Sequence, residues 1–132
     1  MQVLTRDIQK AFTGLRVIVV DDVIDCRDVV ELYLKQMEAE VLAVGSADDA
    51  LSIVGRFQPE LIISDIYMPE RDGYWLIKQF NRLNIKIPKI ALTVAAKDVD
   101  RDRLLAAGYD GYISKPFIFE DLNRLITKLT TN

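Results

Sequence analysis

The 132-residue sequence contains no histidine. Without an imidazole, the chain cannot form a Ser-His or Cys-His nucleophile pair or a zinc site with histidine ligands. Its single cysteine, Cys26, excludes an intramolecular disulfide and is typical of proteins from a reducing compartment. Because Cys26 stands among apolar residues, we expect it to be a small buried packing residue and not a catalytic thiol.

Long apolar runs and runs of one charge are also missing. No stretch approaches the roughly 18 apolar residues that span a bilayer, and the N-terminus lacks the basic and apolar regions of a secretory signal. The net charge of −3 is spread over interspersed acids and bases, which disfavours non-specific attraction to nucleic acid. We therefore expect a cytoplasmic protein in which this domain binds neither membrane nor nucleic acid.

Apolar runs that resemble strands alternate with helical patterns along the chain. The runs near residues 16–20, 61–64 and 89–93 are nearly continuous in Val, Ile and Leu, as in parallel strands covered on both faces. Five β-α units of roughly 20–25 residues predict an α/β fold, a doubly wound five-stranded parallel sheet with right-handed crossovers. The expected strands are Arg16–Val20, Val41–Val44, Leu61–Ser64, Lys89–Thr93 and Gly111–Ser114.

Helical spacing and boundary residues place the helices between these strands. Ser46 precedes a helical stretch as an N-cap, Pro59 closes that stretch, and Gly108 follows another as a C-cap. Two helices should each bury one apolar face. These faces consist of Cys26, Val29, Val30, Tyr33 and Met37 in the first helix and of Leu122, Leu125, Ile126 and Leu129 in the last.

Residues 1–13 precede the first strand and form an N-terminal extension to a domain over residues 14–130. An apolar stripe at helical spacing in this segment consists of Leu4, Ile8, Ala11 and Phe12. We expect a short helix docked on the domain; a contact surface for a partner or a second copy is the alternative.

Polar side chains stand where four of the apolar strands end. Asp21 and Asp22 follow the first, Asp65 follows the third, Thr93 ends the fourth, and Lys115 follows the fifth. Taken alone, each aspartate could be a turn residue or a helix cap, Thr93 could be an ordinary strand residue, and Lys115 could be a surface lysine. In an open parallel sheet, however, the carboxyl ends of the strands form the ligand-binding edge.

The gathered charges favour a divalent cation and a phosphoryl group at this edge. Two carboxylates about 4 Å apart repel by roughly 4 kcal/mol at an effective dielectric of 20. Mg²⁺ with oxygen ligands relieves such repulsion. Lys115 adds a second positive charge, and Pro116 after it fixes the local backbone and is compatible with a cis peptide bond.

These residues together resemble the receiver domain of bacterial response regulators, the CheY-like fold with strand order 2-1-3-4-5. The resemblance covers the chain from about Leu15 to Leu129. It rests on an ordered set of matching residues at the usual spacings of that family: Asp21-Asp22, Arg27, Asp65, Met68-Pro69, Gly73, Thr93 and Lys115-Pro116.

The resemblance implies a role for each site residue. Asp65 would be the phosphoacceptor, and Asp22, Asp65 and the backbone carbonyl of Tyr67 would bind Mg²⁺ directly, with Asp21 holding the ion through water. Thr93 and Lys115 would contact the phosphoryl group. Thr93 and Tyr112 would then carry a switch to the face made by the fourth helix, fifth strand and last helix, over residues 99–129. On that face, Ile118 and Phe119 either bind a partner or pack at the entry of the last helix.

The implied function is a stand-alone response regulator that receives a phosphoryl group from a sensor histidine kinase or a phosphotransfer protein. It would act on a downstream protein target, with a homodimer left open, and would catalyse only its own phosphorylation and dephosphorylation. A flavin-binding protein is excluded because the acidic segment after the first strand repels phosphate. A haloacid-type phosphatase is excluded because Val23 and Tyr67 stand where it needs aspartate. A degenerate receiver that only binds proteins is the alternative.

Overall fold

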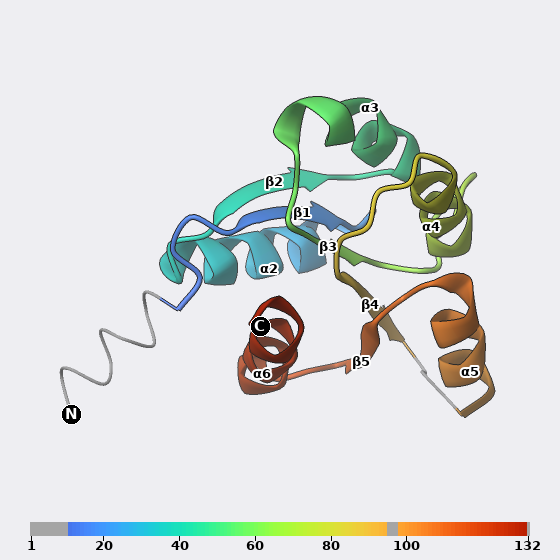
Figure 1. Cartoon of the computed structure of the whole chain (residues 1–132). Coiled ribbons are helices and arrows are strands. Elements are labelled where there is room, and N and C mark those ends of the chain that lie inside the picture. Colours follow the sequence, from blue (N-terminus) through green and yellow to red (C-terminus); the bar gives the residue numbers. More distant parts are fainter. Residues whose placement is uncertain (1–10, 95–97, 132) are drawn as a thin grey trace, which may run out of the picture.

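The computed structural model describes residues 11–94 and 98–131, which alternate strands with helices (Figure 1). The strands are β1 (Arg16–Val20), β2 (Glu40–Val44), β3 (Leu61–Ser64), β4 (Lys89–Val94) and β5 (Gly111–Lys115). The helices are α2 (Ile24–Gln36), α3 (Ala47–Phe57), α4 (Gly73–Arg82), α5 (Asp98–Ala107) and α6 (Phe119–Thr130).

The strands form one parallel sheet in the order β2-β1-β3-β4-β5. Helices α2 and α6 cover one face of the sheet, and α3, α4 and α5 cover the other (Figure 1). The predicted doubly wound α/β fold is therefore confirmed. The predicted bounds of β1 and β3 agree with the structure, while β2 begins one residue earlier and β4 and β5 each run one residue further.

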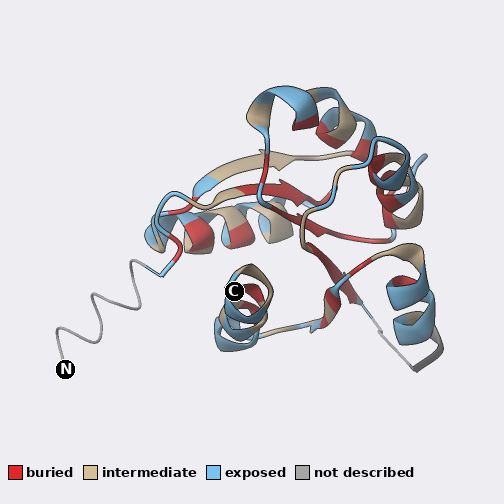
Figure 2. Cartoon of the chain, in the orientation of Figure 1, coloured by how far each residue is buried: buried red, intermediate tan, exposed pale blue. Residues whose placement is uncertain are grey.

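The core lies on both faces of the three central strands. Val17 and Val19 of β1 point to the α2 and α6 side, whereas Ile18 and Val20 point to the α3 and α4 side. Every residue of β3 is buried, while β2, at the sheet edge, is only partly covered (Figure 2). The continuous apolar runs read from the sequence thus mark strands covered on both faces, as expected for parallel sheets.

The buried face of α2 agrees only in part with the predicted one, since Tyr33 and Met37 pack against the core as predicted. Val30 and Leu34 are its buried residues, whereas Val29 is 49 % exposed and Cys26 is only partly buried. Cys26 is thus less buried than predicted, because this helix turns the stripe of Val30 and Leu34 toward the sheet. In α6 the predicted face is correct, with Leu122 and Ile126 buried and Leu125 and Leu129 packed against the same core.

The predicted helix boundaries agree with the backbone. The Ser46 hydroxyl accepts a hydrogen bond from the Asp49 backbone N–H at 3.0 Å, which caps α3. That helix ends at Phe57, before Pro59, and Gly108 follows α5 with a left-handed φ of 118°. A residue with a side chain would be strained there, so glycine suits this C-cap.

The predicted N-terminal helix falls mostly on residues 1–10, which lie outside the described residues. Residues 11–14 form a turn, not a helix. Phe12 is buried, belongs to the core on the α2 and α6 side, and donates its backbone N–H to the Met37 carbonyl at 3.2 Å. Within the described ranges, no helix has the length and apolar character needed to cross a membrane.

Candidate functional site

Four strand ends bring the predicted site residues to the same edge of the sheet. Asp21 directly follows β1 and Asp65 directly follows β3, and the Asp65 backbone N–H donates to the Val20 carbonyl at 2.8 Å. Thr93 is the residue before the last in β4, and Lys115 is the last residue of β5. Because all strands are parallel, every carboxyl end lies at this edge.

Three carboxylates converge at the centre of this edge. One oxygen from each of Asp21, Asp22 and Asp65 lies within 4.8 Å of the other two. Asp21 and Asp65 are 2 % and 7 % exposed, and Oδ1 of Asp22 is buried without a hydrogen-bond partner in the described part of the chain. A buried carboxylate oxygen without a partner is unfavourable unless it meets a cation or a donor. The donor set is therefore the kind of oxygen cluster that suits Mg²⁺.

Lys115 supplies the positive charge next to these acids. Its Nζ lies 2.9 Å from Oδ2 of Asp21 and 3.9 Å from Oδ1 of Asp65, and its side chain is only 13 % exposed. Burial alone would lower the pKa of the Lys115 ammonium, but the hydrogen bond and charge of Asp21 outweigh burial, so the pKa is raised. The Lys115-Pro116 peptide bond is cis.

Burial gives Asp65 different electrostatics from an ordinary aspartate. Desolvation raises the pKa of its carboxyl group from 3.8 to about 6, although the Lys115 charge acts in the opposite direction. The charges of Asp21 and Asp22 contribute to this net rise, and the hydrogen bond from the Ile66 N–H to Oδ1, at 2.8 Å, opposes it. A bound cation would favour the ionised form, which is the nucleophilic one.

Hydrogen bonds from neighbouring residues fix the acids in place. The Val23 N–H donates to Oδ1 of Asp21 at 3.0 Å, and the Arg27 guanidinium donates to the Asp21 carbonyl at 3.1 Å. The Ser64 hydroxyl donates to the Asp65 carbonyl at 2.8 Å. Sequence reasoning did not single out Ser64, although a buried hydroxyl within an apolar strand is the signal that could have done so.

The remaining predicted site residues lie in the loop after β3 and in strands β4 and β5. Tyr67 is 52 % exposed in the loop after β3, and Thr93 is 2 % exposed, with its hydroxyl 3.4 Å from the Val94 carbonyl. Tyr112 is partly buried against the core between α4, α5 and the sheet. Ala91 and Thr93 pair with Tyr112 and Ser114, so Thr93 and Tyr112 lie on the same face of the sheet.

The model of the response regulator receiver domain family matches residues 17–127. The chain belongs to this family. Among curated proteins, it is 38 % identical over 112 residues to an uncharacterized 14.6 kDa protein in the sodA1 3′ region of Leptolyngbya boryana; the alignment covers 83 % of this chain and 86 % of that protein. It is 31 % identical to the response regulator SaeR of Staphylococcus aureus, over 85 % of this chain and 50 % of that protein.

Solved receiver structures have the same fold. The chemotaxis protein CheY4 of Vibrio cholerae superimposes with a TM-score of 0.84 at 26 % identity, covering 89 % of this chain and 99 % of that one. A CheY-like receiver domain protein of Methanospirillum hungatei gives 0.81 at 28 % identity, covering 88 % and 93 %. This receiver chain spans about half the length of several curated relatives, including SaeR and the "Probable transcriptional regulator ycf27" of Cyanophora paradoxa.

Proposed function

We propose that this receiver domain is a phosphorylation-dependent switch whose phosphoacceptor is Asp65. The observation that supports this most directly is the convergence of Asp21, Asp22 and Asp65 within 4.8 Å, with the Lys115 ammonium against them. A degenerate binding module has no need for three mutually repelling carboxylates in a largely buried cluster. Family membership supports a two-component role, with a sensor histidine kinase or a phosphotransfer protein as the donor.

The proposed reaction is a phosphoryl transfer between side chains. An oxygen of the ionised Asp65 attacks the phosphorus of the donor phosphohistidine while the P–N bond breaks and the imidazole leaves. The product is an acyl phosphate on Asp65, formed without a diffusible product other than the dephosphorylated donor. Because the chain has no histidine, the phosphohistidine must come from another molecule.

Charge neutralisation is the main contribution of the surrounding residues. Mg²⁺, held by Asp22, Asp65 and the Tyr67 carbonyl and through water by Asp21, would offset the negative charge of the phosphoryl oxygens. Lys115 is already 3.9 Å from Asp65 and would exchange its contact with Asp21 for a phosphoryl oxygen. Thr93, at the same strand edge, would donate its hydroxyl to the phosphoryl group.

The rim of the site supports docking of a donor protein. Val23 and Ile24, directly after the acidic pair, are 48 % and 60 % exposed, and Val29 is 49 % exposed on the next turn of α2. An apolar pocket beside Lys115 is lined by Cys26 and Val29 and by the aromatic residue Phe119. Clustered exposed apolar residues of this kind are typical of protein-binding surfaces.

Labelling with a small phosphodonor separates the proposed function from the degenerate alternative. Acetyl phosphate with Mg²⁺ should add one phosphoryl group that is labile to base and hydroxylamine, and Asp65→Asn should abolish the reaction. Asp48→Asn is a matched control, because Asp48 is an exposed aspartate in an ion pair with Arg71. Labelling that persists in Asp65→Asn, or no labelling of the wild type, would favour a module that does not use phosphorylation.

The proposed output is a surface change on α5, β5 and α6, carried by Thr93 and Tyr112. A phosphoryl group on Asp65 gives the Thr93 hydroxyl a stronger acceptor than the Val94 carbonyl, and the Tyr112 ring can move into the space that Thr93 leaves. Thr93→Ala should still accept phosphate but lose most NMR chemical-shift changes over residues 99–129. Changes of equal size in Thr93→Ala and wild type would contradict this relay.

A further inference from the structure

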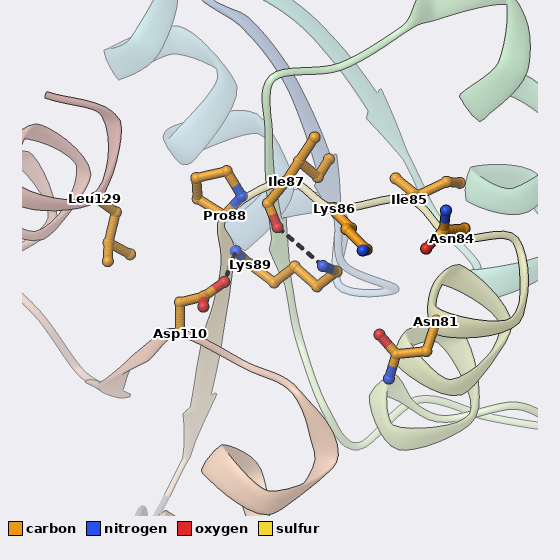
Figure 3. Close-up of a pocket in the computed structure, with 9 residues that line it drawn as sticks. All are labelled: Asn81, Asn84, Ile85, Lys86, Ile87, Pro88, Lys89, Asp110 and Leu129. Atoms are coloured by element: carbon orange, nitrogen blue, oxygen red, sulfur yellow. Dashed lines mark hydrogen bonds between the residues drawn. The ribbon is translucent and has the colours of Figure 1, made fainter. Parts of the chain in front are cut away.

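A pocket of about 430 Å³ lies at the amino-terminal ends of β4 and β5, at the opposite edge of the sheet from the acidic cluster (Figure 3). It lies between the C-terminal end of α4, the segment before β4, and α6. Its volume falls within the range of small-molecule sites in proteins. Nothing in the proposed receiver chemistry uses this pocket.

A buried lysine is the feature that distinguishes this pocket. Lys89 is only 6 % exposed, although lysine is rarely buried without a partner. Its Nζ donates one hydrogen bond, to the Ile87 carbonyl at 2.9 Å. An ammonium group has three donors, and no other hydrogen bond of this group is found among the described residues. Burial lowers the pKa of Lys89, although the Asp110 charge acts in the opposite direction.

The other polar groups of the pocket are arranged around this ammonium. In Figure 3 the side chains of Lys86 and Lys89 reach toward the side formed by Asn81 and Asn84. Asp110 lies at the other end, where its Oδ2 accepts the Lys89 backbone N–H at 2.9 Å. The ammonium groups of the two lysines thus face a common space, while the Asn81 side-chain N–H donates to the Ala107 carbonyl at 3.2 Å and the one carboxylate already accepts a hydrogen bond.

The charge balance and the apolar lining define the class of ligand. Two ammonium groups and one carboxylate leave one net positive charge, which a monoanion would neutralise and a dianion would exceed. Ile85, Ile87, Pro88 and Leu129 supply apolar surface beside the charged groups. We propose that this pocket binds a small organic monocarboxylate, whose carboxylate accepts hydrogen bonds from Lys89 and Lys86 while its hydrocarbon part contacts the isoleucines and Leu129.

The proposal is tested by titrating the full chain with 3-methylbutanoate while recording amide NMR spectra. Saturable shifts should be centred on residues 81–89 and 110. The neutral 3-methylbutanamide, which has nearly the same shape, and inorganic phosphate should each bind at least about tenfold more weakly, because only the monocarboxylate combines a charge-assisted hydrogen bond with an apolar contact.

Three variants identify the groups responsible. Lys89→Met keeps the apolar stem and should weaken binding of 3-methylbutanoate at least about tenfold. Lys86→Met, which alters an exposed side chain and leaves the core intact, should weaken it by a smaller factor. Lys35→Met is the matched control, because Lys35 is an exposed lysine on α2 paired with Glu31, and it should bind as the wild type does.

Several results would overturn the proposal. They are the absence of saturable shifts in this region, equal binding of the amide or of phosphate, and unchanged binding in both Lys89→Met and Lys86→Met. Lys89 would then be a structural residue whose ammonium only donates a hydrogen bond to the Ile87 carbonyl. Because Asp65 takes no part in the pocket, Asp65→Asn should retain binding, so the test is separate from that of phosphorylation.

Discussion

In the absence of metal, the ammonium of Lys115 partly neutralises the negative charge of the acidic cluster. Its ammonium contacts Asp21 at 2.9 Å and lies 3.9 Å from Asp65, in surroundings where water screens little of the interaction. An ion pair of this kind is costly to break, because the remaining partner stays buried and uncompensated. The same contact is temporary in the proposed mechanism, since Lys115 must turn to the phosphoryl group.

Lys115→Met should therefore destabilise the metal-free protein by about 3 kcal/mol, the usual size of a broken buried ion pair. The matched variant Lys35→Met breaks an exposed pair with Glu31 and should lose less than about 0.5 kcal/mol. Urea unfolding in the presence of a chelator measures both values. Equal losses in the two variants would show that Lys115 does not carry the charge balance of the site.

The raised pKa of Asp65 makes stability depend on pH. Between the unfolded value of 3.8 and the folded value of about 6, the folded protein holds a proton that the unfolded chain has lost. The free energy of unfolding therefore falls as pH rises through this window, by at most about 3 kcal/mol.

The variant Asp65→Asn removes this titration, so its stability advantage over wild type should grow from pH 4 to pH 7 in the presence of a chelator. Unfolding curves at several pH values measure the difference between the two proteins. A difference that stays constant or shrinks as pH rises would contradict the raised pKa.

At the scale of elements, the start of α4 controls the loop that carries the acceptor. A Cβ added at Gly73 would lie 2.7 Å from the Asp65 carbonyl oxygen and 2.9 Å from Cα of Ile66. The buried Tyr109 hydroxyl donates to the Gly73 carbonyl at 2.8 Å, which ties the same point to the segment before β5. The helix and the acceptor loop therefore approach so closely that only glycine fits.

Gly73→Ala should destabilise the fold by about 1–3 kcal/mol, because the backbone of Asp65 and Ile66 must move. It should also slow phosphorylation of Asp65. Gly55→Ala is the matched control: Gly55 lies in α3 with nothing within 4 Å of an added Cβ, and alanine should stabilise that helix by up to about 1 kcal/mol. Chemical denaturation that ranks the two variants in the reverse order would contradict the close approach.

The elements themselves were largely predictable, because continuous apolar runs mark the central strands and capping residues mark helix ends. The face of α2 was predictable only in part, since Tyr33 and Met37 pack as predicted but only packing decides between Val29 and Val30. The choice of Asp21 as the resting partner of Lys115 likewise depends on side-chain conformation. The sequence gives no sign that Lys89 differs from an ordinary strand residue that follows a proline. Its burial in a pocket is evident only from the structure.

At the scale of the whole molecule, the acidic cluster should couple metal binding to folding. Mg²⁺ binds the folded arrangement of Asp21, Asp22 and Asp65 and not the unfolded chain, so at about 100 times its dissociation constant it should add about 2.7 kcal/mol. Asp22→Asn should lose most of this gain and be at least as stable as wild type without metal. If Mg²⁺ raises the melting temperature of Asp22→Asn and of wild type by the same amount, the proposed metal site is contradicted.

The most direct measurement is a crystal structure of the protein with Mg²⁺ and beryllofluoride, a mimic of the phosphoryl group. We predict that beryllium is bound to a carboxylate oxygen of Asp65 and that Mg²⁺ is bound by Asp22, Asp65 and the Tyr67 carbonyl. The Lys115 ammonium should have moved from Asp21 to a fluorine atom. An adduct on another carboxylate, or an unmodified Asp65 with Lys115 still paired to Asp21, would contradict the account.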